Sequence, residues 1–281
     1  MAELGRWNTL MAIEMEEAGR GLLVDGGSLG KILTPKRYLP EDAEPGEEFR
    51  LFVYLDSEDR PIATTEEPLA QVGEFAYLEV LSVNSKIGAF LDWGLAKDLL
   101  LPFAEQLGRV REGHRVLVFI KIDRKSKRIL ATMKTHSHLE KSRPDYEKGE
   151  AVSLLVAEET PMGFNAFVNH RHLGLIHHSQ LASPLTIGQN LDGFVADIRP
   201  DGKIDLSLDQ ADYERVGSLS EDILEALRCD PKGFLEMGDK TDPKDIRRTF
   251  GVSKKAFKQA LGALYKQKKI RFVGIGVQLT E

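Results

Sequence analysis

The chain has 281 residues, of which 42% are hydrophobic and 29% are charged, and its formal net charge is −6. This length and composition predict a soluble protein of two or more domains. No run of 18 apolar residues is present, and the N-terminus lacks the basic and apolar segments of a secretory signal. The single cysteine, Cys229, excludes an intramolecular disulfide and a cysteine zinc cluster. We therefore expect a cytoplasmic protein with no membrane segment.

The charge is unevenly distributed. Residues 1–66 carry 7 basic and 14 acidic side chains, and residues 149–213 carry 3 and 9. Residues 214–281 carry 14 basic and 10 acidic side chains, and ten of those cations fall in 244–271 beside one acid, Asp245. Clustered cations favour a polyanionic partner, although a solvated helix face would show the same pattern.

Three stretches repeat one order of short alternating segments and turns. The second stretch, 73–134, is the clearest, and its expected strands are 75–81, 88–92, 98–102, 115–121 and 129–132. The third stretch, 149–208, repeats this order with expected strands at 152–156, 163–168, 174–179, 191–197 and 203–208. The first stretch, about 8–65, is a weaker copy with segments at 19–25, 30–34 and 49–55. Such runs, bounded by turn residues, are typical of small antiparallel barrels.

Specific strings within the repeats resemble the ribosomal S1-type RNA-binding repeat, an OB-fold barrel. They are Gly88-Ala-Phe-Leu, Gly174-Leu-Ile-His-His-Ser and Gly202-Lys-Ile-Asp-Leu-Ser. The resemblance implies an RNA face made of an aromatic pair near the Gly-x-Phe turn, a histidine, and charged residues in the last hairpin. Aromatic rings stack on unpaired bases, and Lys or Arg neutralises phosphates.

Carried over by position, the third repeat has the fullest set of such residues. It keeps Phe164, Phe167, His177 and Lys203, with Arg199 at a position where the S1 family often has an acid. A core position would explain the phenylalanines equally well from alternation alone, and the neighbouring His177 favours a binding face.

The other two repeats have fewer of these residues. The second keeps Phe90, Asp123 and Arg128, with Ile87 at the first aromatic position and Pro102 at the histidine position. The first has Leu22 or Leu23 where aromatics are expected and Leu33 at the histidine position, so we do not expect it to stack on bases.

After residue 209 the hydrophobic period changes from 2 to 3.6. A short capped helix is predicted from Ser220, a brief strand or turn at 233–237, and a helix from Pro243 to Phe250. A longer helix beginning at Ser253 precedes a hairpin over 270–279.

This order of elements resembles a winged-helix domain. Its cationic positions favour phosphate contacts over base reading, for which Gln259 is the main candidate. They are Lys254, Lys255, Lys258, Lys266, Lys268, Lys269 and Arg271. A winged helix used only for contacts with other domains or proteins is the alternative.

Three S1-like repeats followed by a winged helix resemble the bacterial conserved virulence factor B family (CvfB/YitL type). We expect a multidomain chain of three all-β, five-stranded OB-fold barrels and a C-terminal α+β winged-helix domain. The expected barrels span residues 1–66 (a degenerate copy), 67–135 and 148–210, and the expected winged-helix domain spans residues 214–281. Short linkers of mixed composition, at about 66–72, 136–148 and 209–219, predict partial independence of these domains. The resemblance implies a cytoplasmic RNA-binding protein in post-transcriptional regulation, with the third repeat and the winged helix as its main RNA surface.

Two other motifs do not support an enzyme or a metal site. Gly26-Gly-Ser-Leu-Gly30 matches the G-x-S-x-G pattern but lies between two expected strands rather than at a strand-to-helix elbow. His170 and His172 straddle a turn without a carboxylate or cysteine at a ligand spacing. We expect no catalytic residue, metal or cofactor.

The hypothesis is a monomeric protein that binds single-stranded RNA. The alternatives are a winged-helix DNA-binding transcription regulator, or a scaffold that contacts ribosome or RNA polymerase proteins. The candidate RNA-binding residues are Phe164, Phe167, His177, Arg199, Lys203, Phe90, Asp123, Arg128, Lys254, Lys255, Lys258, Lys268, Lys269 and Arg271.

Overall fold

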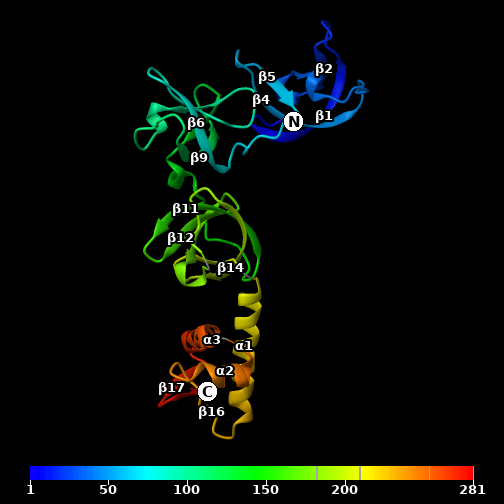
Figure 1. Ribbon diagram of the computed structural model, residues 1–281. Helices are drawn as coiled ribbons and strands as arrows, with labels where there is room; N and C mark the ends of the chain where they lie inside the picture. Colours follow the sequence, from blue (N-terminus) through cyan, green and yellow to red (C-terminus); the bar gives the residue numbers. More distant parts are fainter. Residues whose placement is uncertain (182, 209, 253, 281) are drawn as a thin grey trace. The chain divides into compact units, whose positions relative to one another are not determined.

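The computed structural model describes residues 1–181, 183–208, 210–252 and 254–280 (Figure 1). Its first barrel is closed in the order β1-β2-β3-β5-β4. The strands are β1 (Arg6–Met15), β2 (Gly21–Asp25), β3 (Lys31–Pro35), β4 (Glu48–Leu55) and β5 (Pro61–Thr64). The sequence did not indicate β1 or β5 as strands, because exposed apolar side chains such as Met11 and Met15 obscure the alternation in β1.

The second and third barrels repeat this order of strands. The second is the sheet β10-β9-β6-β7-β8, whose end strands β8 and β10 contact each other, and the third is closed as β11-β12-β13-β15-β14. The strands of the second are β6 (Phe75–Asn84), β7 (Gly88–Leu91), β8 (Leu99–Pro102), β9 (Arg115–Ile122) and β10 (Ile129–Thr132). Those of the third are β11 (Ala151–Thr160), β12 (Gly163–Val168), β13 (His172–His177), β14 (Asn190–Ile198) and β15 (Ile204–Ser207). The prediction of three five-stranded barrels is confirmed.

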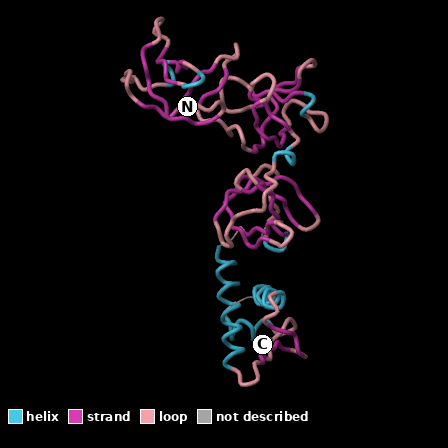
Figure 2. The backbone as a smooth tube through the Cα atoms, turned by 180° about the vertical axis from the view of Figure 1, so that it is seen from behind, coloured by secondary structure: helices cyan, strands magenta, loops and turns pink. Residues whose placement is uncertain are grey.

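Helices follow the third barrel, as the change of colour in Figure 2 shows. The elements are α1 (Gln210–Cys229), β16 (Phe234–Leu235), α2 (Pro243–Phe250), α3 (Lys254–Lys266), β17 (Ile270–Val273) and β18 (Gly276–Leu279), and the sheet order is β16-β18-β17. The predicted winged helix is confirmed. Asp242 caps α2 by accepting a hydrogen bond from the Lys244 backbone N–H at 2.8 Å, and Pro243 occupies the first turn.

Two expectations for this region change. The helix predicted from Ser220 begins at Gln210, so the segment expected to be a linker is the first half of α1. Ser253, expected to cap α3, lies outside the described residues. Among those described residues, no helix has both the length and the apolarity needed to cross a membrane.

The contacts divide the chain into two compact units, and each is described by itself. The first comprises Met1–Arg143, Ser153–Gly174 and Ser183–Leu191. The second comprises Pro144–Val152, Leu175–Ala182 and Asp192–Glu281.

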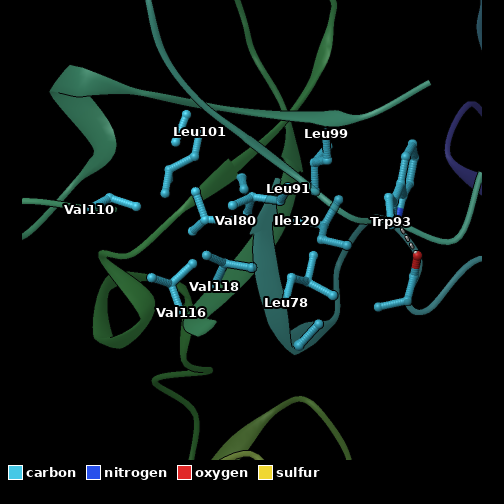
Figure 3. Close-up of a cluster of buried hydrophobic side chains, with 14 of the residues drawn as sticks. Leu78, Val80, Leu91, Trp93, Leu99, Leu101, Val110, Val116, Val118 and Ile120 are labelled. Carbon is cyan, nitrogen blue, oxygen red and sulfur yellow. Dashed lines mark hydrogen bonds between the residues drawn. The ribbon is translucent and has the colours of Figure 1, made fainter. Parts of the chain in front are cut away.

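Within the first unit, side chains of the first barrel join the hydrophobic core of the second. Phe52 of β4 is fully buried and contacts Trp7 and Trp93 edge to face, with ring centroids 5.8 and 5.7 Å apart. The Trp93 indole also donates a hydrogen bond of 2.7 Å to the carbonyl oxygen of Ala70 in the connecting segment (Figure 3). These contacts join two barrels for which the short linker predicted partial independence. The three aromatic side chains are too far apart in the sequence to appear as one pattern.

Candidate nucleic-acid interface

A β-bulge at the same place in each barrel aligns the three repeats by structure. It interrupts the pairing of the first two strands and bends the strand that carries it. The bulges lie between Ala12 and Glu14, between Val80 and Ser82, and between Val156 and Glu158.

The residues paired immediately beyond each bulge identify one equivalent outward position in the three barrels. Glu14 pairs with Leu23, Ser82 with Phe90, and Glu158 with Asn165. Leu23, Phe90 and Asn165 are half-buried, whereas the residues on either side of each point into the barrel and are buried. Phe90 is the one aromatic side chain among these three, so the second barrel presents a ring at this position.

The third barrel presents an amide there. Asn165 Nδ2 donates a hydrogen bond of 2.7 Å to Glu158.

The strand register also changes which residue of the first barrel is assigned to the histidine position of the S1 repeat. Gly21 pairs with Pro35 as Gly88 pairs with Pro102, so Pro35, rather than Leu33, is the counterpart of Pro102.

The structure places the two phenylalanines predicted to stack on bases inside the protein. Phe164 and Phe167 are each 2% exposed, so neither offers a face to a base in this conformation. Phe167 stacks on Phe75 of the second barrel, with ring centroids 3.8 Å apart and planes 7° apart. Alternation could not show this, because a ring that points away from its own barrel core can still be covered by a neighbouring barrel.

A pocket of about 370 Å³ opens beside Phe90. Ile87, Leu100 and Pro102 line its apolar part with Phe90, and Arg128 lies on its rim. The structure thus brings together two residues that the sequence predicted separately, Phe90 and Arg128.

Two cations of the second barrel, Lys97 and Arg128, border this pocket together with a carboxylate of the first barrel, Asp59. Lys97 Nζ lies 3.2 Å from Asp59 Oδ1 and donates a hydrogen bond of 2.5 Å to the carbonyl oxygen of Asp56, and Arg128 pairs with Asp59 Oδ2. Desolvation acts to raise the pKa of Asp59, but the hydrogen bonds and charges of Lys97 and Arg128 outweigh it and hold that pKa below its usual value. Sequence reasoning missed Lys97 and Asp59, because they join the site from a loop and from another repeat.

The hairpin between β9 and β10 adds further cations. Arg124, Lys125 and Lys127 are exposed. Asp123 shapes the turn: its Oδ2 accepts hydrogen bonds from the backbone N–H and the hydroxyl of Ser126 at 2.7 and 2.8 Å. The backbone hydrogen bond from Ser126 is the main reason that the pKa of Asp123 is lowered. The structure therefore gives Asp123 a local role in holding the basic hairpin.

On the third barrel, His177 and Arg199 meet at Asp205. Arg199 binds both carboxylate oxygens, with Nε 2.7 Å from Oδ2 and a terminal nitrogen 2.6 Å from Oδ1. His177 Nε2 lies 3.2 Å from Oδ1, and the hydrogen bonds that Arg199 donates to Asp205 raise the pKa of Arg199. Asp205 was not predicted, although its place in the last hairpin strand is where the S1 resemblance expects charge. Lys203 is exposed and pairs with Asp201 at 3.2 Å.

The predicted cations of the winged helix lie on its surface. Lys258, Lys268, Lys269 and Arg271 are exposed, and Lys254 is half-buried. Arg271 donates to Gln278 Oε1 at 2.8 Å. Among the side chains described in residues 254–280, no lysine or arginine forms an ion pair, whereas Arg248 of α2 pairs with Asp245 at 3.3 Å. The side chain of Lys255 lies outside the described residues.

Comparison with known families matches both ends of the chain. Residues 4–66 match the model of the S1 domain, and residues 221–279 match the CvfB-like winged helix domain. The S1 match falls on the repeat expected to be degenerate. The first barrel is therefore still recognisable as an S1 domain although Leu23, rather than an aromatic residue, occupies its outward position. The class is thus a multidomain protein of S1-type barrels joined to a winged helix. The chain resembles proteins of the CvfB/YitL family.

Individual proteins resemble the chain over most of its length. YitL of Bacillus subtilis (strain 168) is 28% identical over 246 residues, which are 85% of this chain and 82% of that protein. Conserved virulence factor B of Staphylococcus haemolyticus is 26% identical over 250 residues, 86% of this chain and 82% of that protein. The crystal structure of a multidomain protein with nucleic acid binding domains from Streptococcus pneumoniae TIGR4 is 25% identical, covers 99% of this chain and 98% of its own, and has a TM-score of 0.41.

Proposed function

We propose that this protein binds single-stranded RNA and acts in post-transcriptional regulation of gene expression. The observation that carries the proposal is Phe90, an outward-facing ring that lines a pocket rimmed by Arg128 and bordered by the basic 123–128 hairpin. A flat ring beside cations can stack on a base while the neighbouring phosphates are neutralised.

The pocket favours an unpaired base over a base pair. In a duplex the faces of the bases are covered by their neighbours, whereas in a single strand a base can turn out of the stack. The apolar part of the pocket beside Phe90, where Ile87, Leu100 and Pro102 are among the lining residues, suits one such base.

Asp59 would compete with a phosphate of bound RNA for two cations of the site. Its carboxylate pairs with Lys97 and Arg128, the cations that a phosphate would also contact. Binding at these two positions therefore exchanges one anion for another. Most of the net electrostatic gain comes from those cations of the hairpin and of the winged helix that form no ion pair among the described side chains.

Fluorescence anisotropy of the full chain with single-stranded RNA, single-stranded DNA and duplex DNA of mixed sequence, each at two salt concentrations, tests the proposal. We expect RNA to bind more tightly than duplex. A preference for duplex would favour the DNA-binding alternative, and binding to none of the three would favour a protein scaffold.

A matched pair of substitutions tests the site. Phe90→Leu is expected to weaken RNA binding, by up to about 1–3 kcal/mol, because the stacking surface is lost while apolar bulk is kept. Phe103→Leu is the control, since Phe103 is 47% exposed on the same barrel but does not line the pocket. Equal binding by the two variants would contradict the assignment.

The regulatory part of the proposal is tested in cells. Deletion of the gene is expected to change the half-lives of transcripts that cross-link to the protein, without a change in the activity of their promoters. A change in promoter activity alone would contradict post-transcriptional regulation.

A further inference from the structure

Two aromatic rings lie exposed side by side on the winged helix. Tyr265, in the last turn of α3, is 55% exposed, and Phe272 of β17 is 45% exposed. Their ring centroids are 5.4 Å apart, with planes at 51°. The buried core of this domain is formed by other side chains, including Phe257 and Leu261. The pair is thus surplus to the core and open to a ligand.

A glycine leaves open space next to this pair. Gly262 lies inside α3, where glycine destabilises a helix relative to alanine. A Cβ placed on Gly262 would meet no atom within 4 Å, so no neighbour in the described structure requires the glycine. Residues three positions apart lie on one helix face, so the bare backbone at Gly262 borders Tyr265. The helix surface beside the ring is therefore flat and unfilled.

The surroundings of the pair are cationic. Between the two rings in sequence lie four exposed cations, Lys266, Lys268, Lys269 and Arg271. No Asp or Glu occurs from residue 246 to residue 280. Lysine is depleted at protein–protein interfaces, whereas nucleic-acid surfaces combine such cations with aromatic rings. The chemistry fits a polyanion that carries flat apolar faces.

We propose that Tyr265 and Phe272 form a stacking site for unpaired bases of single-stranded RNA, with Gly262 leaving room for a base. Lys266, Lys268 and Lys269 contact the flanking phosphates. The inference rests on the proposed RNA-binding function and extends it to a second stacking site, distinct from Phe90. It also assigns the winged helix a use other than insertion of α3 into a duplex groove.

The test uses the full chain carrying Phe90→Leu, so that the second barrel contributes no stacking. The probe is a single-stranded RNA of mixed sequence containing 2-aminopurine, whose fluorescence falls when it stacks. Tyr265→Leu and Phe272→Leu are each expected to weaken binding by roughly 5-fold or more and to reduce the quenching. Tyr265→Phe keeps the ring and is expected to bind as its parent does.

Gly262→Gln separates a binding role from a structural one. Glutamine is a better helix former, and its side chain has space, so the melting temperature of the domain is expected to rise by roughly 4–8 °C. The same side chain covers the strip beside Tyr265, so RNA affinity is expected to fall. A rise in stability with unchanged affinity would contradict the role given to Gly262.

The outcomes distinguish this inference from the proposed function. Unchanged affinity and quenching in Tyr265→Leu and Phe272→Leu would overturn the inference and leave the RNA-binding proposal standing. Failure of the wild-type chain to bind single-stranded RNA would overturn both.

Discussion

At the scale of single residues, Phe90 and Phe167 show how the packing of neighbouring barrels decides what a ring can do. Both follow an alanine in a strand next to the bulged one. Phe90 lines an open pocket, whereas Phe167 lies against Phe75 and is 2% exposed. A ring's contribution to binding or to stability therefore follows from what covers it.

Phe167→Ala is expected to destabilise the protein by about 3–5 kcal/mol, because it removes a buried ring and leaves a cavity. Urea unfolding followed by circular dichroism measures this change. Phe167→Leu, which fills more of the space, is expected to leave RNA affinity unchanged. A loss of affinity in a fully folded Phe167→Leu variant would restore the prediction that this ring stacks on bases.

His170 gives the contact between the second and third barrels a pH dependence. Its Nδ1 accepts a hydrogen bond of 3.0 Å from the Phe75 backbone N–H. Burial lowers the pKa of His170 below its ordinary value of 6.5, against the opposing charge of Glu74. A protonated Nδ1 cannot accept that hydrogen bond.

Because the folded-state pKa is the lower one, the stabilising contribution of His170 is complete above about pH 6.5 and is lost as the pH falls through the folded-state value. We expect the urea midpoint of the wild type to fall between pH 7 and pH 5 by more than that of His170→Gln. Parallel curves for the two proteins would contradict this role.

At the scale of elements, α3 and the segment leading into the β17–β18 hairpin present exposed lysine side chains on the protein surface. Lys258, Lys268 and Lys269 are exposed and have no ion-pair partner among the described side chains. Cations held in this way can release counterions from a polyanion without first breaking a contact within the protein. Arg128 and Lys97 differ, since each must leave Asp59.

Replacing Lys258, Lys268 and Lys269 together by Gln is expected to reduce the salt dependence of RNA binding. At about 0.7 per phosphate contact for a single strand, the slope of log affinity against log salt should fall by roughly 2. The control replaces Lys31, Lys36 and Lys141, also exposed, by Gln, which makes an equal change in net charge. The two triple variants having the same slope would refute a role for this surface.

At the scale of the whole molecule, the first two barrels form one folded body. Trp7, Phe52 and Trp93 meet at their junction, and Phe52 is fully buried. The chain contains two tryptophans in all, and both lie here. Tryptophan fluorescence therefore reports on this junction alone, whereas circular dichroism reports on every domain.

Phe52→Ala is expected to cost about 3–5 kcal/mol at the junction. The tryptophan-detected urea transition should move to lower concentration, and the loss of helical signal from α1–α3 should stay where it is. A shift of both transitions together would show that the whole chain unfolds as one unit.

Sequence patterns were enough to predict the barrels and the winged helix, but not the candidate site. Alternation and turn residues define strands locally, so most strands of the second and third repeats were predicted within two or three residues. Alternation alone does not tell which set of residues in a strand points outward; in β7 the burial of Ala89 and Leu91 shows that Phe90 does. Asp59 and Lys97 come from distant parts of the chain, and Phe167 is covered by another repeat, so these contacts appear only in three dimensions.

The outward position beyond each bulge can affect binding without affecting the packing of the barrel core. Leu23, Phe90 and Asn165 occupy equivalent backbone positions in the three barrels, and their side chains lie outside the barrel interior. Under the proposed function, a substitution at such a position would change the affinity for RNA more than the stability of the barrel. An aromatic side chain introduced at Leu23 or Asn165 would then add a second ring at an equivalent position.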